Sequence, residues 1–410
     1  MKLIIDKAGK NSKHPDKKTG IMAKKISHIL MIGVFALCSL SCSIEAAEQR
    51  EGTDAPATNK GKKWRIGYIE GGPWQDYQSN LAALIISLAK MGWIENKSLP
   101  AYKDKHETRT IWSWLTADVK SDYLEFVADA YWSAGWDENT RKEIKKDVIT
   151  RLNKKKDIDL MLAFGTTAAQ DMVNNLHSVP TMVLSSSDPI RAGIVKSAED
   201  SGYDHIHARV DPTRYERQIR LFHKIARFKT LGIAFEDTLA GRTYAAIEDA
   251  KKVAGELGFE VIKCHAPDDD IPDIQERDRR LLECYQKLAP RVDAFYLTAH
   301  KSLTLKNLPM LLAPFLDHKV ATFSQGRTGE VKHGVLISLA RPNFRPVGRF
   351  FAKTFTRILQ GAKPRDLPQI FQERQEIAIN LETARKIGFP FPMDILAGAK
   401  EIYERIEPAE

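Results

Sequence analysis

The sequence predicts an α/β protein made of two doubly wound parallel-sheet lobes joined by a multi-strand hinge. Two observations predict this class. Short apolar runs that end in glycine, serine or threonine alternate with longer amphipathic runs, as strands and helices do around parallel sheets. The same alternation occurs twice along the chain, and 410 residues suffice for two lobes with separate cores.

The first lobe is predicted to begin with a strand over residues 64–69, which reads WRIGYI. The helix that follows places apolar residues three and four positions apart and stops at Gly92. A helix over 141–156, a buried strand over 160–164 and a strand over 181–184 come next. We predict an irregular stretch from Val195 to Val210.

A helix that starts at Asp211-Pro212 is predicted to cross to the second lobe, where the pattern repeats. The predicted strands cover residues 230–235, 259–264, 294–297, 319–323 and 334–339, and the predicted helices cover 242–257, 274–288 and 305–315. A further helix over 344–359 is predicted to return to the first lobe. We therefore assign residues 64–210 and 341–362 to the first lobe, and residues 211–340 and 363–410 to the second.

Residues 97–136 interrupt the first lobe and are rich in aromatic side chains. Five of the seven tryptophans lie between Trp93 and Trp136. One interpretation is an aromatic lining for a ligand pocket. The other, which we favour, is an inserted helical hairpin whose aromatic side chains pack into a small core of their own.

The first 46 residues are predicted to be a signal peptide with an N-terminal extension. The basic segment Met22–Lys25 precedes an apolar run of twelve residues, Ile29–Leu40, which fits a secretory signal better than a membrane span. Residues 1–21 are polar and rich in lysine, so we expect translation to begin at Met22. Residues 47–63 have the composition of a flexible linker.

The net charge of +9 does not indicate a nucleic-acid partner. Residues 1–42 hold eight lysines and two aspartates, so this leader carries +6 and leaves +3 on the rest of the chain. An exported protein with so small a charge is not expected to bind nucleic acid.

The end of the leader allows two kinds of processing. Ser39–Cys42 resembles a bacterial lipobox, in which Cys42 would be lipidated after cleavage, although a lipobox prefers leucine where this chain has Ser39. Simple cleavage near Ala46 or Ala47 is the alternative, and the sequence leaves both open. In either case we expect the mature protein in the periplasm or cell envelope, free or anchored by lipid.

The body of the chain contains two cysteines, Cys264 and Cys284. An exported protein can join such a pair in a disulfide, but two separate buried thiols remain an equal alternative on sequence grounds. No Cys/His spacing matches a structural metal site, and we expect neither a metal nor a cofactor.

The stretch from Asp159 to Val195 contains the most informative candidate site. Gly165 follows a buried strand, and Thr166 and Thr167 follow it at the start of a predicted helix. Ligands bind beyond the carboxyl ends of parallel strands, and the free amides of a helix start attract anions. These residues could therefore hold a ligand carboxylate. The alternative is that a threonine only caps its helix.

Taken in order, several segments of the chain resemble the substrate-binding proteins of ABC transporters that have the type I periplasmic-binding fold. The resemblance is to the branch that includes tryptophan and tyrosine uptake proteins, and it extends from about Trp64 to Phe389. The segments that carry it are Phe164–Gln170, Ser187–Pro189, Ala192–Val195, Val292–Tyr296, Ala378–Ala384 and Ile387–Gly388.

The resemblance implies a two-lobed clamp that closes on a small molecule, often an amino acid, and delivers it to an ABC permease in the inner membrane. It also implies that the ligand contacts come from the strand exits of both lobes. In this chain those residues are Gly71, Gly72, Trp74, Gly165, Thr166, Thr167, Ser185, Ser186, Ser187, Asp237, Thr238, Ala299, His300, Ser324 and Gln325.

Two other functions are alternatives. The cluster Ser185–Asp188 with His300 or His318 could be imagined as a secreted hydrolase, but the sequence has no G-x-S-x-G elbow, phosphate loop or zinc signature, so we expect no enzyme. The ligand-binding module of an envelope sensor would share all the features above, and neighbouring permease and ATPase genes would distinguish it. We expect a monomer.

Overall fold

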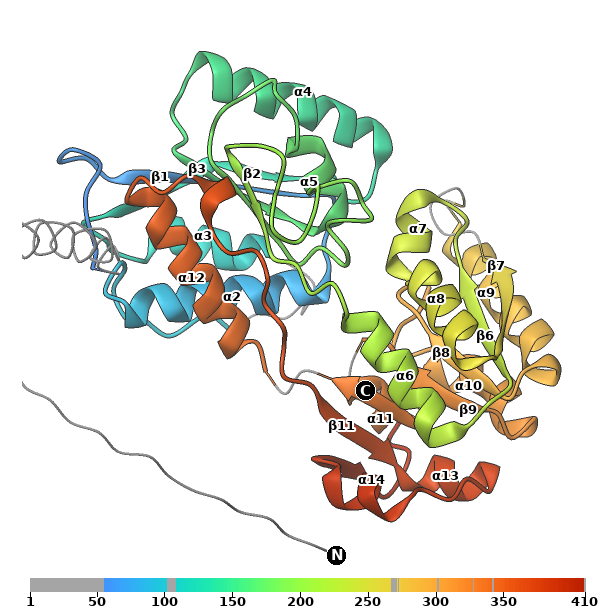
Figure 1. The fold of residues 1–410 in the computed structure, drawn as a ribbon. Coiled ribbons are helices and arrows are strands. Elements are labelled where there is room, and N and C mark those ends of the chain that lie inside the picture. Colours follow the sequence, from blue (N-terminus) through green and yellow to red (C-terminus); the bar gives the residue numbers. More distant parts are fainter. Residues whose placement is uncertain are drawn as a thin grey trace, which may run out of the picture. The chain divides into compact units, whose positions relative to one another are not determined.

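The computed structural model describes residues 55–101, 108–266, 271, 273–300, 302–326, 328–340 and 343–408 (Figure 1). The predicted leader, including Cys42, lies outside these residues. Within them the chain forms one five-stranded and one seven-stranded sheet, each with helices on both faces. The predicted fold class is confirmed.

The first sheet has the strand order β2-β1-β3-β4-β5, and all its neighbours are parallel. Its strands are β1 (Trp64–Glu70), β2 (Leu124–Ser133), β3 (Leu160–Phe164), β4 (Thr181–Leu184) and β5 (Ile206–Ala208). Its helices are α2 (Gln75–Lys90), α3 (Arg109–Ala117), α4 (Glu138–Lys154), α5 (Gly165–Met172) and α12 (Arg345–Leu359). The central strands read as unbroken apolar runs because both faces of the sheet are covered.

Alternate side chains of the central strands enter two different cores. Leu160, Leu162 and Phe164 pack with α2, α3 and α12, whereas Met161 and Ala163 pack with α4 and α5. Figure 1 shows the two groups of helices on opposite sides of the first sheet. The strand exits are therefore left at one edge, between the two layers.

The second sheet has the order β12-β11-β10-β9-β8-β6-β7. It is parallel from β10 to β7, whereas β11 runs antiparallel to β10. Its strands are β6 (Thr230–Phe235), β7 (Glu260–His265), β8 (Ala294–Leu297), β9 (Ala321–Ser324), β10 (Ile337–Ala340), β11 (Glu376–Asn380) and β12 (Glu401–Tyr403).

Helices cover the second sheet on both faces as well. The α-helices are α6 (Arg214–Ala226), α7 (Leu239–Tyr244), α8 (Ile247–Leu257), α9 (Ile274–Leu288), α10 (Leu308–Asp317), α11 (Thr328–Lys332), α13 (Leu381–Ile387) and α14 (Met393–Gly398). Two short 3-10 helices complete the chain, η1 (Ala289–Arg291) and η2 (Pro364–Asp366). None of the helices in the described part of the chain has both the length and the apolarity needed to cross a bilayer.

The chain passes between the sheets in segments that contact one another. Val210 forms a parallel bridge with Ile370, and its amide donates to the carbonyl of Gln369 at 2.8 Å. Helix α12 returns to the first sheet and packs on α2 so closely that a Cβ at Gly348 would lie 2.5 Å from the backbone of Ala83. We keep the lobe boundaries predicted from the sequence as a proposal.

The helical hairpin predicted for residues 97–136 is wrong. Where the structure describes this segment, it forms one helix, α3, and then the edge strand β2, which pairs in parallel with β1. Trp112 and Phe126 do pack together, with ring centroids 5.6 Å apart, but they do so in the core of the first sheet. The strand extends an existing sheet, which buries more apolar area than a separate hairpin would.

Two further element predictions are wrong in detail. The stretch that we predicted to be irregular contains the short strand β5. The single helix predicted over 242–257 is two helices, α7 and α8, separated at Ala246, which adopts a left-handed conformation (φ 52°). No glycine or proline marks this break in the sequence.

Cys264 and Cys284 form a disulfide, with their Cα atoms 5.6 Å apart. The bond joins β7, at the edge of the second sheet, to the covering helix α9. Of the two alternatives that the sequence left open, the disulfide is therefore the one found.

Candidate functional site

The loop after β1 is held against the rest of the first lobe. Gly71 and Gly72 are both buried, and a Cβ at Gly72 would come within 2.6 Å of Trp136. The indole nitrogen of Trp136 donates to the carbonyl of Pro73 at 3.1 Å. Trp74 is partly buried against the first core. The absence of side chains at Gly71 and Gly72 therefore leaves room for Trp136, which was not predicted from the sequence to be a site residue.

The exit of β3 contains the predicted cradle, but the threonines do not cap the helix. Helix α5 begins at Gly165 itself (φ +83°), and its cap position, Phe164, provides no side-chain hydrogen bond. The capping interpretation of Thr166 and Thr167 is therefore wrong. Instead, the hydroxyl of Thr166 lies 3.1 Å from that of Ser186.

The exit of β4 lies beside that of β3. Ser185 adopts a left-handed conformation (φ 59°), and its hydroxyl accepts a hydrogen bond from Asn80 at 3.2 Å. Such a conformation costs on the order of 1–3 kcal/mol in a residue other than glycine and is common at functional sites. The carbonyl of Ser187 accepts a hydrogen bond from the Tyr215 hydroxyl at 3.4 Å. The structure therefore brings the first-lobe candidates together.

The second-lobe candidates separate into two groups. Asp237 pairs with Arg242, and Thr238 caps α7 by accepting from the amide of Gly241, so their polar atoms have local roles. His300 is buried, and its Nδ1 accepts from the amide of Ser302 at 3.1 Å. These contacts resemble those of structural residues.

Gln325 belongs to the other group. Its side-chain nitrogen donates to the carbonyl of Tyr244 at 2.8 Å, and its side-chain oxygen accepts from the amide of Ala299 at 3.4 Å. The hydroxyl of Ser324 donates to Glu330. Gln325 therefore connects two strand exits to α7.

Residues of the second sheet's helices contact the exits of the first sheet. The Tyr244 hydroxyl lies close to the side chains of Thr167 and Thr166. Burial raises the pKa of Tyr244, and the two threonines only partly oppose the shift. On α8, Asp249 forms an ion pair with Arg191 of the first lobe at 3.0 Å. The predicted strand exits of the two lobes therefore meet through Tyr244.

Several residues in this region were missed by sequence reasoning, chiefly Tyr77, Arg214 and Tyr244. The hydroxyl of Tyr77 occupies the space that a Cβ at Gly165 would need. Arg214 lies in the first turn of α6, with its guanidinium carbon 5.2 Å from the centroid of the Tyr215 ring. A cation at a helix start opposes the helix dipole, and this anomaly could have identified Arg214 from sequence.

Arg214 keeps its charge in this partly buried position. Burial lowers its pKa, but the electrostatic effect of nearby acidic groups, Tyr215 and Glu373 first, outweighs it and raises the pKa above the ordinary value. Asp76, in the first turn of α2, contributes to the same effect. The region thus holds a fixed positive charge.

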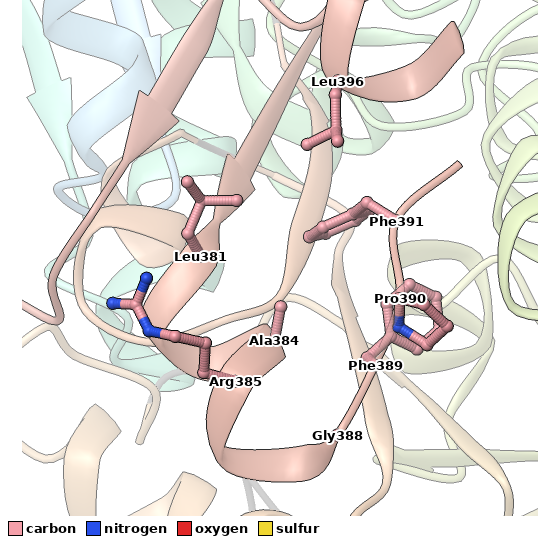
Figure 2. A pocket seen from close by; sticks show the side chains of 8 residues that line it. All are labelled: Leu381, Ala384, Arg385, Gly388, Phe389, Pro390, Phe391 and Leu396. Carbon is pink, nitrogen blue, oxygen red and sulfur yellow. The ribbon is translucent and has the colours of Figure 1, made fainter. Parts of the chain in front are cut away.

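An apolar hollow of about 370 Å³ lies elsewhere, on α13 and the segment before and within α14 (Figure 2). It contains none of the predicted site residues. Its lining residues are Leu381, Ala384, Arg385, Gly388, Phe389, Pro390, Phe391 and Leu396. Among the described residues, no three histidine, cysteine or acidic side chains are grouped so that they could hold a metal ion.

Comparison with known proteins gives one family match. Residues 132–403 match the model described as ABC transporter substrate binding protein. A curated relative, the tyrosine-binding protein of Clostridioides difficile (strain R20291), is 21% identical over 373 residues, which make up 90% of this chain and 93% of the relative.

Two solved structures resemble the chain in fold. One is an ABC domain from Streptococcus pneumoniae in complex with L-Trp, at a TM-score of 0.62 and 18% identity. The other is a conserved domain protein from Vibrio cholerae, at a TM-score of 0.61 and 17% identity. In each case the match covers 83% of this chain and 100% of the other.

Proposed function

We propose that this chain captures a small molecule between its two lobes for import, because it belongs to the family of ABC transporter substrate binding proteins. In this proposal an ABC permease in the inner membrane receives the ligand. The protein acts in the periplasm or cell envelope, after export by the signal peptide in residues 1–46, either free or anchored through Cys42. It binds its ligand without altering it chemically.

The observation that carries the proposal is the contact between the two lobes near their strand exits, where Asp249 of α8 pairs with Arg191 at 3.0 Å and the Tyr215 hydroxyl of α6 donates to the carbonyl of Ser187. It joins a helix of the second sheet to strand exits of the first, which is where ligands bind in open α/β sheets. A ligand that contacts both sets of exits would hold the lobes together. The predicted contact residues at the exits of both lobes are retained as part of this proposal.

The proposed ligand is a small carboxylate-bearing molecule, and an aromatic amino acid is the first choice. The names of two similar proteins support this choice, because one is a tyrosine-binding protein and the other was solved with L-Trp. Hydroxyls and amides at the strand exits can bind the polar end of such a molecule, and Tyr77, Tyr244 or Trp136 can contact its ring.

A thermal-shift screen tests the proposal. The protein, produced with its own leader, is heated with amino acids, other carboxylates and sugars. A ligand at 100 times its Kd should stabilise the fold by about 2.7 kcal/mol, which appears as a higher Tm. Mass spectrometry of the recovered ligand should show an unchanged molecule. If no solute raises the Tm, or if the ligand is recovered as a product, the proposal is wrong.

A further inference from the structure

We propose that Arg214 binds the carboxylate of the ligand. This assignment rests on the proposed function. It differs from the sequence-based expectation, which placed the carboxylate on the helix start at Gly165.

Arg214 has one buried donor without an acceptor. Its Nε is shielded from solvent and has no hydrogen-bond partner, and no ion pair of its guanidinium is found within the described ranges. The residue as a whole is partly exposed. A buried donor without an acceptor is costly, and a ligand carboxylate would remove that cost.

The acidic residues near Arg214 are already paired with other arginines. Glu373 forms an ion pair with Arg209 at 3.3 Å, and both side chains are 6% exposed. Asp211 forms a two-pronged pair with Arg217, with distances of 3.0 and 2.9 Å. Arg214 lies between these two arginines in the sequence and is the one of the three without an ion pair among the described residues.

The expected alternative site, at the start of α5, is already filled by protein groups. The Tyr77 hydroxyl lies against Gly165, Thr166 contacts Ser186, and the Tyr244 hydroxyl lies close to both threonines. A ligand carboxylate there would have to displace these contacts. At the Nε of Arg214, which has no hydrogen-bond partner, it would displace none.

Helix α6, which carries Arg214 in its first turn, contacts strand exits of both lobes. Its neighbour Tyr215 donates to the carbonyl of Ser187 in the first lobe. On the other side, Tyr296 donates to Gln218, and Gln218 donates to the carbonyl of Gln325 at 3.1 Å. A carboxylate bound to Arg214 therefore lies next to the residues proposed to contact the ligand.

Calorimetric titration with matched ligands tests the assignment. The probes are L-tryptophan and L-tyrosine, the amines tryptamine and tyramine, which lack the carboxylate, and indole-3-propionate, which lacks the ammonium group. The wild type should bind an amino acid about 100-fold more tightly than its amine, and Arg214→Gln should remove about 100-fold of the amino-acid affinity while leaving amine binding unchanged. Indole-3-propionate keeps the carboxylate, so it should also lose affinity in Arg214→Gln.

Two variants serve as comparisons. Arg214→Lys keeps a charge but loses the fork of donors, so it should retain an intermediate affinity. Arg220→Gln removes a surface arginine from the same helix, where Arg220 pairs with Glu256, and should bind like the wild type. The Tm of ligand-free Arg214→Gln should stay close to that of the wild type, because the described residues give the side chain of Arg214 no hydrogen bond or ion pair to lose; a large drop in Tm would indicate a structural arginine.

The outcomes distinguish this inference from the proposed function. Equal binding of an amino acid and its amine by the wild type, or undiminished amino-acid binding by Arg214→Gln, overturns the assignment. The first of these comparisons needs no variant and holds even if Arg214→Gln fails to fold. Binding of a sugar but of no carboxylate overturns the assignment and leaves solute capture standing, whereas the absence of any ligand overturns both.

Discussion

At the scale of single residues, Gly165 is the position where the fold leaves least freedom. It has a φ of +83°, and an added Cβ would lie 1.7 Å from the hydroxyl oxygen of Tyr77. Gly165→Ala should therefore lower the free energy of unfolding by at least about 2 kcal/mol, since it combines overpacking with an unfavourable backbone conformation. Denaturant titration in the absence of ligand measures this change.

The matched control is Gly255→Ala. Gly255 lies within α8, and a Cβ there would meet no atom within 4 Å. Alanine should raise the stability by roughly 0.5–1 kcal/mol, because it is the better helix former. Equal effects at the two positions would contradict the geometry described for Gly165.

Sequence reasoning identified the small residues of the site better than its large ones. Gly165, Thr166 and Ser186 were predicted because glycine and hydroxyl residues after apolar runs have a direct local meaning. Arg214 and Tyr244 were missed because each lies on a helix after the crossing to the second lobe. Only the tertiary arrangement shows that Tyr244 reaches a strand exit almost 80 positions earlier in the chain.

At the scale of elements, the strands were the easier prediction and the exceptions have local causes. The apolar runs of β3, β4, β6 and β8 are short, buried and bounded by polar residues, so their length and boundaries identify them as strands. Strand β2 was taken for a helix because its aromatic residues carry no single period. The break at Ala246 has no sequence signal, since it depends on contacts such as the one between Gln325 and Tyr244.

The contribution of Asp249, which pairs with Arg191, to the stability of the fold should depend on pH. Asp249 is 3% exposed, and burial raises its pKa to about 6, although Arg191 opposes the shift; Asp188 and Glu216 reinforce it. The unfolded chain has the ordinary pKa of about 4. This group therefore stabilises the fold below pH 4, and the contribution is lost as the pH rises through 6.

We expect Asp249→Asn to remove that dependence. Between pH 4 and pH 7 the wild type should lose about 3 kcal/mol of stability relative to the variant, from a shift of roughly two pKa units. Urea titrations at several pH values measure the difference. Glu248→Gln, an exposed neighbour paired with Lys251, is the control and should leave the slope nearly unchanged. A constant difference between the wild type and Asp249→Asn would contradict the prediction.

The disulfide should contribute measurably to the stability of the second lobe. It closes a loop with a sequence separation of 20 residues, for which the chain-entropy relation gives about 3 kcal/mol. Replacing Cys264 and Cys284 together by alanine should lower the free energy of unfolding by that amount. Reduction of the wild type should have a similar effect on the denaturant midpoint, and a loss below about 1 kcal/mol would argue against the prediction.

At the scale of the whole molecule, each sheet has its own cores. Two apolar clusters flank the first sheet and two flank the second, and none of these clusters of described residues includes strands of both sheets. We therefore expect the ligand-free protein to unfold in two calorimetric steps. A saturating ligand that contacts both lobes should raise and merge them. A single transition with equal calorimetric and van't Hoff enthalpies in ligand-free protein would be evidence against independent cores.

The two-lobed class was predictable because it depends only on a pattern that repeats. The pairing of the crossing segments at Val210 and Ile370 was not, because it joins parts of the chain that lie 160 residues apart. The close packing of α12 on α2 was not predictable either, because it depends on the lack of a side chain at Gly348. Long-range contacts of this kind carry no local signal.

The position of the disulfide has a consequence for how copies of the protein behave toward one another. Strand β7 ends the second sheet, none of its side chains is fully buried, and such an edge invites pairing with a strand of another molecule. The disulfide from Cys264 to Cys284 links this edge covalently to helix α9 of the same molecule. In a reducing cytosol the disulfide would not form, and the edge would lack this covalent link. Aggregation of protein produced there would therefore reflect the choice of compartment rather than a poorly folding sequence.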